Sequence, residues 1–168
     1  MSEKIAKWIP IARREIGQKE WNNGWNPRIK EYQKSSVGGY FNDDGGPGRR
    51  NSWCACFVTW TLRKAGISSL SGYDAMRARA YLNYGIAIES PDFGAIAIKG
   101  KGHVGFVVGV GPQGEVAMLG GNQGDAVNIR LYSARAAKDL KYRWPKGVSK
   151  TSVSKMDVTG IAYQGGVQ

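Results

Sequence analysis

The stretch GRRNSWCACFVTW, residues 48–60, holds both cysteines of the chain, one residue apart and between two tryptophans. Its apolar spacing predicts a helix that Gly66 ends, with Ser52 or the residue before it as the N-cap. Cys54 then lies in the first turn, where free N–H groups and the helix dipole favour a thiolate. Cys56 lies roughly 200° around the same helix, on a different face. We expect Cys56 to pack in the core.

A packing role for Cys54 fits the same pattern. Cys54 shares one helical stripe with Val58, Leu62 and Ala65, and free cysteines are among the most buried residues. The helix alone therefore leaves both a nucleophile and a core residue open.

The segments around this helix predict the fold class. Apolar residues at helical spacing predict helices over residues 3–17, from Pro27 (capped by Asn26) to about residue 34, and over residues 74–83. From residue 93 the pattern changes to short alternating runs separated by Gly, Pro, Asn and Asp, typical of an antiparallel meander. Helices first and sheet second indicate an α+β domain, which we expect to cover residues 1–145. Residues 146–168 are expected to form a tail or an extra hairpin of unknown function.

The composition argues against metal and cofactor chemistry. The chain has 168 residues, enough to bury a core without staples. Cysteines at this spacing cannot easily form a disulfide, and with a single histidine they are too few for a zinc site. Gly109 to Gly114 match a dinucleotide-binding pattern, but a strand follows them instead of a helix. We expect no metal and no cofactor.

His103 is the only histidine in the chain. It begins the most apolar strand, so a cysteine hydrolase built on this sequence must use it as its base. The third member of such a site orients the imidazole, and the stretch LGGNQGD after the next strand offers Asn122, Gln123 and Asp125. A neighbouring antiparallel strand would bring one of these beside His103. This order of groups is that of a papain-like site.

The net charge indicates the kind of partner. A formal charge of +11 favours polyanions, but the basic residues are spread along the chain, so we expect no specific nucleic acid. No apolar run approaches the ~18 residues of a membrane span. The first 17 residues are charged throughout and lack the apolar core of a signal peptide. We expect synthesis in the cytoplasm without a signal peptide, no membrane span, and a monomer.

SWCACFV resembles the nucleophile segment of the papain-like bacterial cell-wall hydrolases, the CHAP and NlpC-type amidases and endopeptidases. GHVGFVVG is similar to their histidine strand and LGGNQGDAV to the strand end that carries the third polar residue. A Trp before the cysteine, a Gly-Gly-Asn-Gln run and the segment YRWP are similar to one subgroup. The resemblance covers about residues 5 to 145.

By position, the resemblance implies that Cys54, not Cys56, is the nucleophile. It implies that His103 is the general base and acid, and that Asn122 orients it. Many relatives carry an acidic residue at the position of Gly120, so in this chain a neutral amide takes the third role.

The resemblance implies a peptidoglycan-degrading cysteine hydrolase that cleaves an amide bond of the stem or cross-link peptide, with Trp53 and Gln123 as candidate substrate-binding residues. It would act in the periplasm or cell wall, either as a lysin released by a holin or as a secreted antibacterial effector. An effector would need an immunity protein, which we expect to be acidic. The alternatives are an N-acetylmuramoyl-L-alanine amidase with the same residues, an acyltransferase, and a non-catalytic basic module that binds envelope polymers or nucleic acid.

Overall fold

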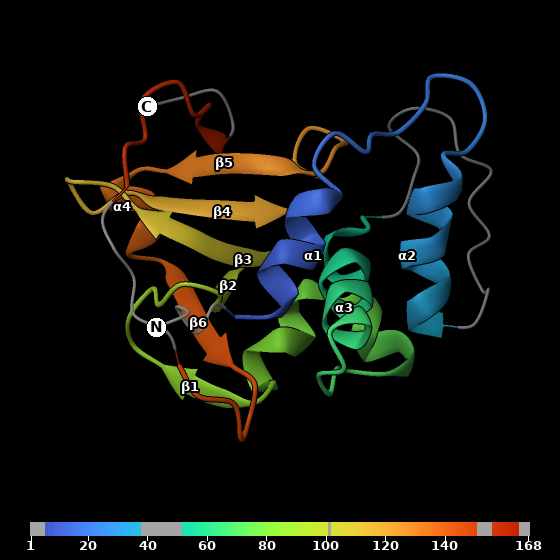
Figure 1. Cartoon of the computed structure of the whole chain (residues 1–168), viewed down its shortest axis with the longest axis horizontal. Helices are drawn as coiled ribbons and strands as arrows, with labels where there is room; N and C mark the ends of the chain where they lie inside the picture. The colour runs from blue at the N-terminus through green and yellow to red at the C-terminus, as the bar shows by residue number, and fades with distance from the viewer. Residues whose placement is uncertain (1–5, 38–51, 101, 151–155, 165–168) are drawn as a thin grey trace.

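The computed structural model describes residues 6–37, 52–100, 102–150 and 156–164. Helices come first along this part of the chain and a six-stranded sheet follows (Figure 1), which confirms the α+β class. The helices are α1 (Trp8–Arg14), α2 (Pro27–Val37), α3 (Cys54–Lys64) and α4 (Ala134–Ala137), with the 3-10 helices η1 (Gly72–Met76) and η2 (Ala78–Asn83). The strands are β1 (Ile86–Ile88), β2 (Ile96–Lys99), β3 (His103–Val110), β4 (Val116–Gly120), β5 (Asn128–Tyr132) and β6 (Leu140–Trp144).

The sheet has the order β1-β6-β2-β3-β4-β5, and every neighbouring pair is antiparallel. Strands β2 to β5 form the predicted meander. The last strand, β6, inserts between β1 and β2, so that Ile96 lies opposite both Phe106 of β3 and Arg143 of β6. The local pattern did not reveal β1 or β6 because their partners lie far away along the chain.

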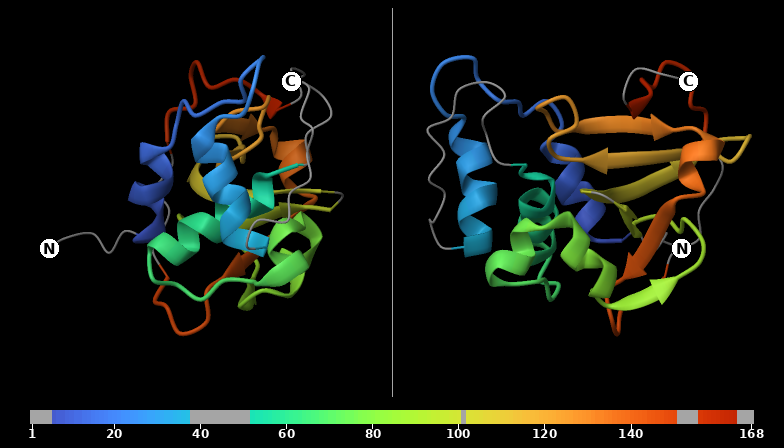
Figure 2. Two further views of the ribbon diagram at one scale, coloured as in Figure 1. Left: turned by 90° about the vertical axis from the view of Figure 1, so that its right-hand side faces the viewer. Right: turned by 180° about the vertical axis from the view of Figure 1, so that it is seen from behind.

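Helix α3 lies between the sheet and α2 (Figure 2). It is buried along most of its length because apolar residues occupy all of its faces, which is typical of a core helix. Phe57 packs edge-on against Phe106 of β3, with 6.5 Å between ring centroids, and against Tyr32 of α2, with 5.2 Å. The helix that carries both cysteines is therefore fixed from two sides.

The two predicted helix caps differ in outcome. Asn26 caps α2 as predicted, since its Oδ1 accepts a hydrogen bond from the Arg28 N–H at 2.9 Å. Helix α3 begins without a side-chain cap, and its N-cap residue is Trp53. Ser52, a predicted cap, lies instead 3.5 Å from the Cys54 sulfur. The other candidate cap, residue 51, lies outside the described residues.

The helix predicted over residues 74–83 is replaced by the 3-10 helices η1 and η2. Arg77 between them has an extended backbone, with φ −112° and ψ 118°. Thr59 of α3 explains the division, because its hydroxyl donates to the Ala75 carbonyl at 3.0 Å and lies 2.6 Å from the Tyr81 hydroxyl. Each short helix is thus attached separately to α3, and one continuous helix would not place both contacts.

Residues 156–164 return to the sheet. The Met156 N–H donates to the Val110 carbonyl at 2.9 Å, and the Leu131 N–H donates to the Ala162 carbonyl at 2.9 Å. This segment therefore contacts the ends of β3 and β5. The domain boundary at residue 145 stays a prediction, although the segment beyond it packs on the same sheet.

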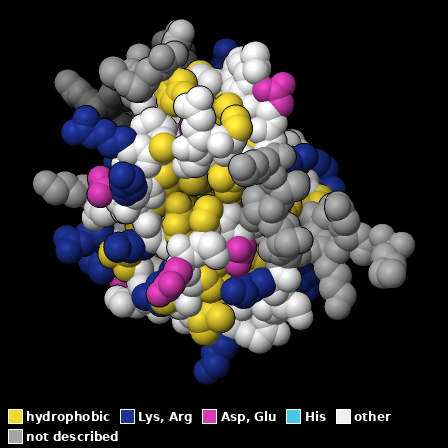
Figure 3. Space-filling model, turned by 90° about the vertical axis from the view of Figure 1, so that its left-hand side faces the viewer, with side chains coloured by type: hydrophobic (Ala, Val, Ile, Leu, Met, Phe, Trp, Pro, Cys, Tyr) yellow, Lys and Arg dark blue, Asp and Glu magenta, His cyan; other side chains and the backbone are white. Residues whose placement is uncertain are grey.

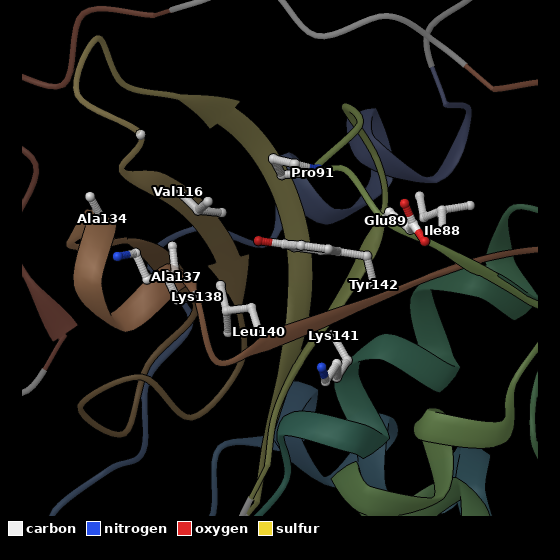
Figure 4. A pocket seen from close by; sticks show the side chains of 11 residues that line it. Ile88, Glu89, Pro91, Val116, Ala134, Ala137, Lys138, Leu140, Lys141 and Tyr142 are labelled. Carbon is white, nitrogen blue, oxygen red and sulfur yellow. The ribbon is translucent and has the colours of Figure 1, made fainter.

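The surface has both apolar and basic regions. On the face that carries α4, hydrophobic side chains gather in the middle and Lys and Arg side chains lie around them (Figure 3). A cavity of about 490 Å³ lies between α4 and β6, and the Tyr142 ring points into it (Figure 4). Among the described residues, no helix has the length and apolar character needed to cross a membrane.

Candidate active site

Cys54 is the first residue of α3 and is only 2% exposed. Its sulfur lies 3.5 Å from the Ser52 hydroxyl oxygen and 3.8 Å from the carbonyl oxygen of Gly102, just before β3. The first hydrogen bond of the helix runs from the Phe57 N–H to the Trp53 carbonyl at 2.9 Å. The N–H groups before Phe57 have no helical acceptor and carry the positive end of the helix dipole. The sulfur thus lies where negative charge is favoured.

The two thiols have opposite electrostatic environments. Burial alone would raise the pKa of Cys54, but the His103 imidazole, the Ser52 hydroxyl and the Val104 N–H together hold that pKa below its ordinary value. Burial raises the pKa of Cys56 to about 11, and the charge of Cys54 adds to the rise. Of these two thiols, Cys54 is therefore the one whose surroundings favour the thiolate.

His103 is the first residue of β3, and a buried amide fixes its orientation. Its Nε2 lies 2.9 Å from the Oε1 of Gln123. The Nε2 of Gln123 donates to the Met118 carbonyl at 3.3 Å, and to the backbone and side-chain oxygens of Asn128 at 2.8 and 3.1 Å. These three acceptors fix the amide so that its oxygen faces the imidazole. His103 therefore donates through Nε2–H, and its Nδ1 is left for the thiol.

Asn122, the predicted orienting residue, does not make this contact. Its Nδ2 donates to the Ser52 hydroxyl at 3.2 Å, so it reaches the nucleophile through Ser52 instead of holding His103. The chain turns tightly here, since Asn122 has a left-handed backbone with φ 57°, and the side chain of the next residue is the one beside His103. Asparagine tolerates this left-handed conformation better than most residues, which is the signal in the sequence that could have pointed to Gln123.

Gly120, at the end of β4, explains why a loop residue takes the orienting role. A Cβ at this position would lie 3.3 Å from the His103 Nε2 and 3.2 Å from the Oε1 of Gln123. The position at which the resemblance implies an acidic residue therefore faces the same imidazole nitrogen. In this chain the Gln123 amide fills the space that a side chain at Gly120 would occupy.

Trp53 and Gln123, the predicted substrate-binding residues, are both fully buried at 0% exposure. The Trp53 Nε1–H donates to the Glu20 carboxylate at 2.8 Å, and its ring stacks on Tyr32 at 5.9 Å between centroids. Gln123 holds the imidazole. Both side chains point into the protein and support the site from behind, and substrate contact by either stays a prediction.

Cavities lie on two sides of the reactive groups. One, of about 510 Å³, is lined by Ser52, Cys54, Gly102 and a basic segment that includes Arg77 and Arg79. The other, of about 440 Å³, is lined by Lys99, Gly100, Gly102, His103, Tyr132, Asp139 and Gln164. No pattern in the sequence pointed to Tyr132, which is the last residue of β5. Gly102 lines both cavities.

The site chemistry consists of a thiol, an imidazole and neutral amides. Within the described ranges, no group of three or more His, Cys, Asp and Glu residues is placed to hold a metal ion. The arrangement of Cys54, His103 and Gln123 can deprotonate a thiol, direct it at a carbonyl carbon and return the proton to a leaving group.

The family model of the CHAP domain matches residues 42–122. The matched segment contains Cys54, His103 and Asn122 and covers just under half of the chain. The match supports the CHAP superfamily, whose domains are typically cysteine- and histidine-dependent amidases or peptidases of the cell wall. The narrower subgroup stays a prediction. Comparison with curated protein sequences and with solved structures found no significant match.

Proposed function

We propose that this protein is a cysteine hydrolase that cleaves an amide bond in the stem or cross-link peptide of peptidoglycan. The observation that carries the proposal is the Cys54 thiol at the start of α3, whose pKa is lowered beside an imidazole held by a buried amide. The CHAP match to this segment supports a peptidoglycan hydrolase or amidase type of function. The formal charge of +11 suits a polyanionic envelope, where it raises encounter rates at low salt.

Acylation follows from this geometry. The Cys54 thiolate forms a bond to the amide carbonyl carbon, and the oxygen takes the negative charge next to the free N–H groups at the start of α3. The carbon–nitrogen bond then breaks. The leaving amine takes its proton from Nδ1 of the protonated His103, while Gln123 keeps the ring in place through Nε2.

Deacylation uses the same imidazole in the opposite direction. His103 accepts a proton from water at Nδ1, and the resulting hydroxide adds to the thioester carbonyl carbon. The carbon–sulfur bond breaks and the thiolate is restored. Within the protein, only Cys54 and His103 change their bonding or protonation in the complete cycle, and water supplies the proton that the leaving amine carries away.

The test is digestion of purified peptidoglycan with products identified by mass spectrometry. We expect wild type to release fragments, and Cys54→Ala and Cys54→Ser to release none. Cys56→Ala is the matched control, since it removes the other buried thiol of the same helix and should retain activity within about threefold of wild type. Thermal unfolding of each variant separates loss of chemistry from loss of fold.

Fragment masses identify the bond. Fragments with new termini within the peptides support the proposal, whereas release of intact stem peptides from the glycan indicates the muramoyl-alanine amidase instead. If wild type releases nothing, or if folded Cys54→Ala equals wild type, the hydrolase assignment is wrong.

A further inference from the structure

Tyr132 is the one tyrosine in the described residues whose buried hydroxyl has no hydrogen-bond partner. It is the last residue of β5, it is only 2% exposed, and it lines the same cavity as His103. Buried hydroxyls in proteins nearly always have a hydrogen-bond partner, so an unpartnered hydroxyl beside a cavity is explained if a bound molecule supplies the partner. Burial raises the pKa of Tyr132, and the charge of Cys54 raises it further. The hydroxyl therefore keeps its proton and remains a donor.

The two cavities beside the reactive groups contact different members of the pair. Cys54 lines the cavity that contains Arg77, and His103 lines the cavity that contains Tyr132. In amide cleavage the sulfur bonds to the acyl carbon, and the imidazole gives its proton to the departing nitrogen. The departing part of the substrate must therefore lie on the side of His103, and the acyl part on the side of Cys54.

We propose that the cavity lined by Lys99, His103 and Tyr132 is the leaving-group subsite, and that the Tyr132 hydroxyl donates a hydrogen bond to a carbonyl oxygen of the departing amino acid. The proposal rests on the proposed hydrolase function. It adds the side of the site that takes the departing amino-acid part of the substrate and the residue that binds this part, and it excludes a side-chain carboxamide that releases only ammonia.

The charges in the subsite agree with this substrate. The Lys99 ammonium lies 5.6 Å from the centre of the Tyr132 ring, and Asp139 also lines the cavity. One positive and one negative side chain suit a fragment that carries both amino and carboxylate groups. An alkyl amine would offer no partner for the Lys99 ammonium or for the Tyr132 hydroxyl.

The test compares Tyr132→Phe with Tyr142→Phe. Tyr142 is a buried tyrosine on β6 that lines the separate cavity beside α4 (Figure 4), so it controls for loss of a phenol from the same sheet. Each variant is assayed on a muropeptide that wild type cleaves, and on the methyl ester of the same acyl part. The methanol released from the ester is too small to reach Tyr132.

We expect Tyr132→Phe to lower kcat/KM on the muropeptide by about three- to tenfold, the loss of one neutral hydrogen bond. Turnover of the ester and alkylation of Cys54 by iodoacetamide should stay as in wild type, and Tyr142→Phe should match wild type throughout. Equal losses on muropeptide and ester, or slower alkylation, would show that Tyr132 acts on the thiol and imidazole and would overturn the proposal.

No loss on the muropeptide would overturn it as well. Failure of the hydrolase function itself is distinct, because wild type would then cleave neither compound.

Discussion

Replacing Gln123 by leucine tests the central contact of the site. Leucine has a similar size but can neither accept a hydrogen bond from His103 nor donate to Met118 and Asn128. Gln123 is fully buried, so water cannot take its place. The His103 Nε2–H and the carbonyls that Gln123 serves would then lose their partner.

The expected magnitude follows from these contacts. A hydrogen bond to a charged group is worth about 1.5–3 kcal/mol, and Gln123 supports the imidazolium that forms when the thiol ionises. Since about 1.4 kcal/mol corresponds to a factor of ten, we expect Gln123→Leu to lower kcat by about 10- to 150-fold. Unfolding free energy should fall by about 1–3 kcal/mol because buried polar groups are left unpaired.

The assay is the pH profile of iodoacetamide alkylation at Cys54, measured beside peptidoglycan hydrolysis and thermal unfolding. With His103 poorly held, the pKa of Cys54 should rise toward its ordinary value, so the profile of Gln123→Leu should move to higher pH. Asn122→Ala is the matched comparison. It removes the neighbouring side-chain amide, which donates a hydrogen bond to Ser52 and not to His103. It should have the smaller effect.

A wild-type profile and wild-type turnover for Gln123→Leu, together with large losses for Asn122→Ala, would refute the reasoning. That result would return the orienting role to Asn122, as the resemblance first implied.

Three further results are expected. Iodoacetamide should label Cys54 at pH values at which an ordinary thiol is protonated, because the Cys54 thiolate persists until the pH falls below its lowered pKa. Cys56, with a pKa of about 11, should stay unlabelled in the folded protein, and peptide mapping would show which thiol reacted. Gly121→Ala should lower the unfolding free energy by about 1–3 kcal/mol, since the new Cβ would lie 2.6 Å from the Trp53 indole. Gly100→Ala is the control: it has open space around the new Cβ and should show little change in thermal unfolding. Gly120→Asp should lose stability and activity because its Cβ enters the space of the Gln123 side chain. Adding Gln123→Ala to this variant should restore part of the peptidoglycan hydrolysis.

The sequence predicted those parts of the fold that depend on local pattern. The helix that begins with Cys54, the capped start of α2 and the four-stranded meander all follow from spacing, caps and turn residues. The division of residues 74–83 into two 3-10 helices and the insertion of β6 between β1 and β2 depend on contacts between distant segments. No local pattern contains those contacts.

The candidate site divides in the same way. Cys54 and His103 were predictable because one starts a helix, the other starts a strand, and His103 has no competitor in the sequence. The amide that contacts the imidazole was not, because it depends on the course of a tight loop in which Asn122, Gly124 and Asp125 all have positive φ: the Asn122 side chain contacts Ser52, and Gln123 contacts His103. Position in a motif identifies the loop but not which amide of the loop reaches the imidazole.

The choice of Gln123 over a side chain at Gly120 has a chemical consequence. A carboxylate at that place would stabilise the imidazolium by its full charge, whereas a neutral amide orients the ring and stabilises the imidazolium through one hydrogen bond only. The thiolate of Cys54 must therefore depend more on its other partners, the Ser52 hydroxyl, the Val104 N–H and the start of α3. In a site of this kind, the helix N-terminus supplies part of the stabilisation that an acidic third residue would otherwise provide.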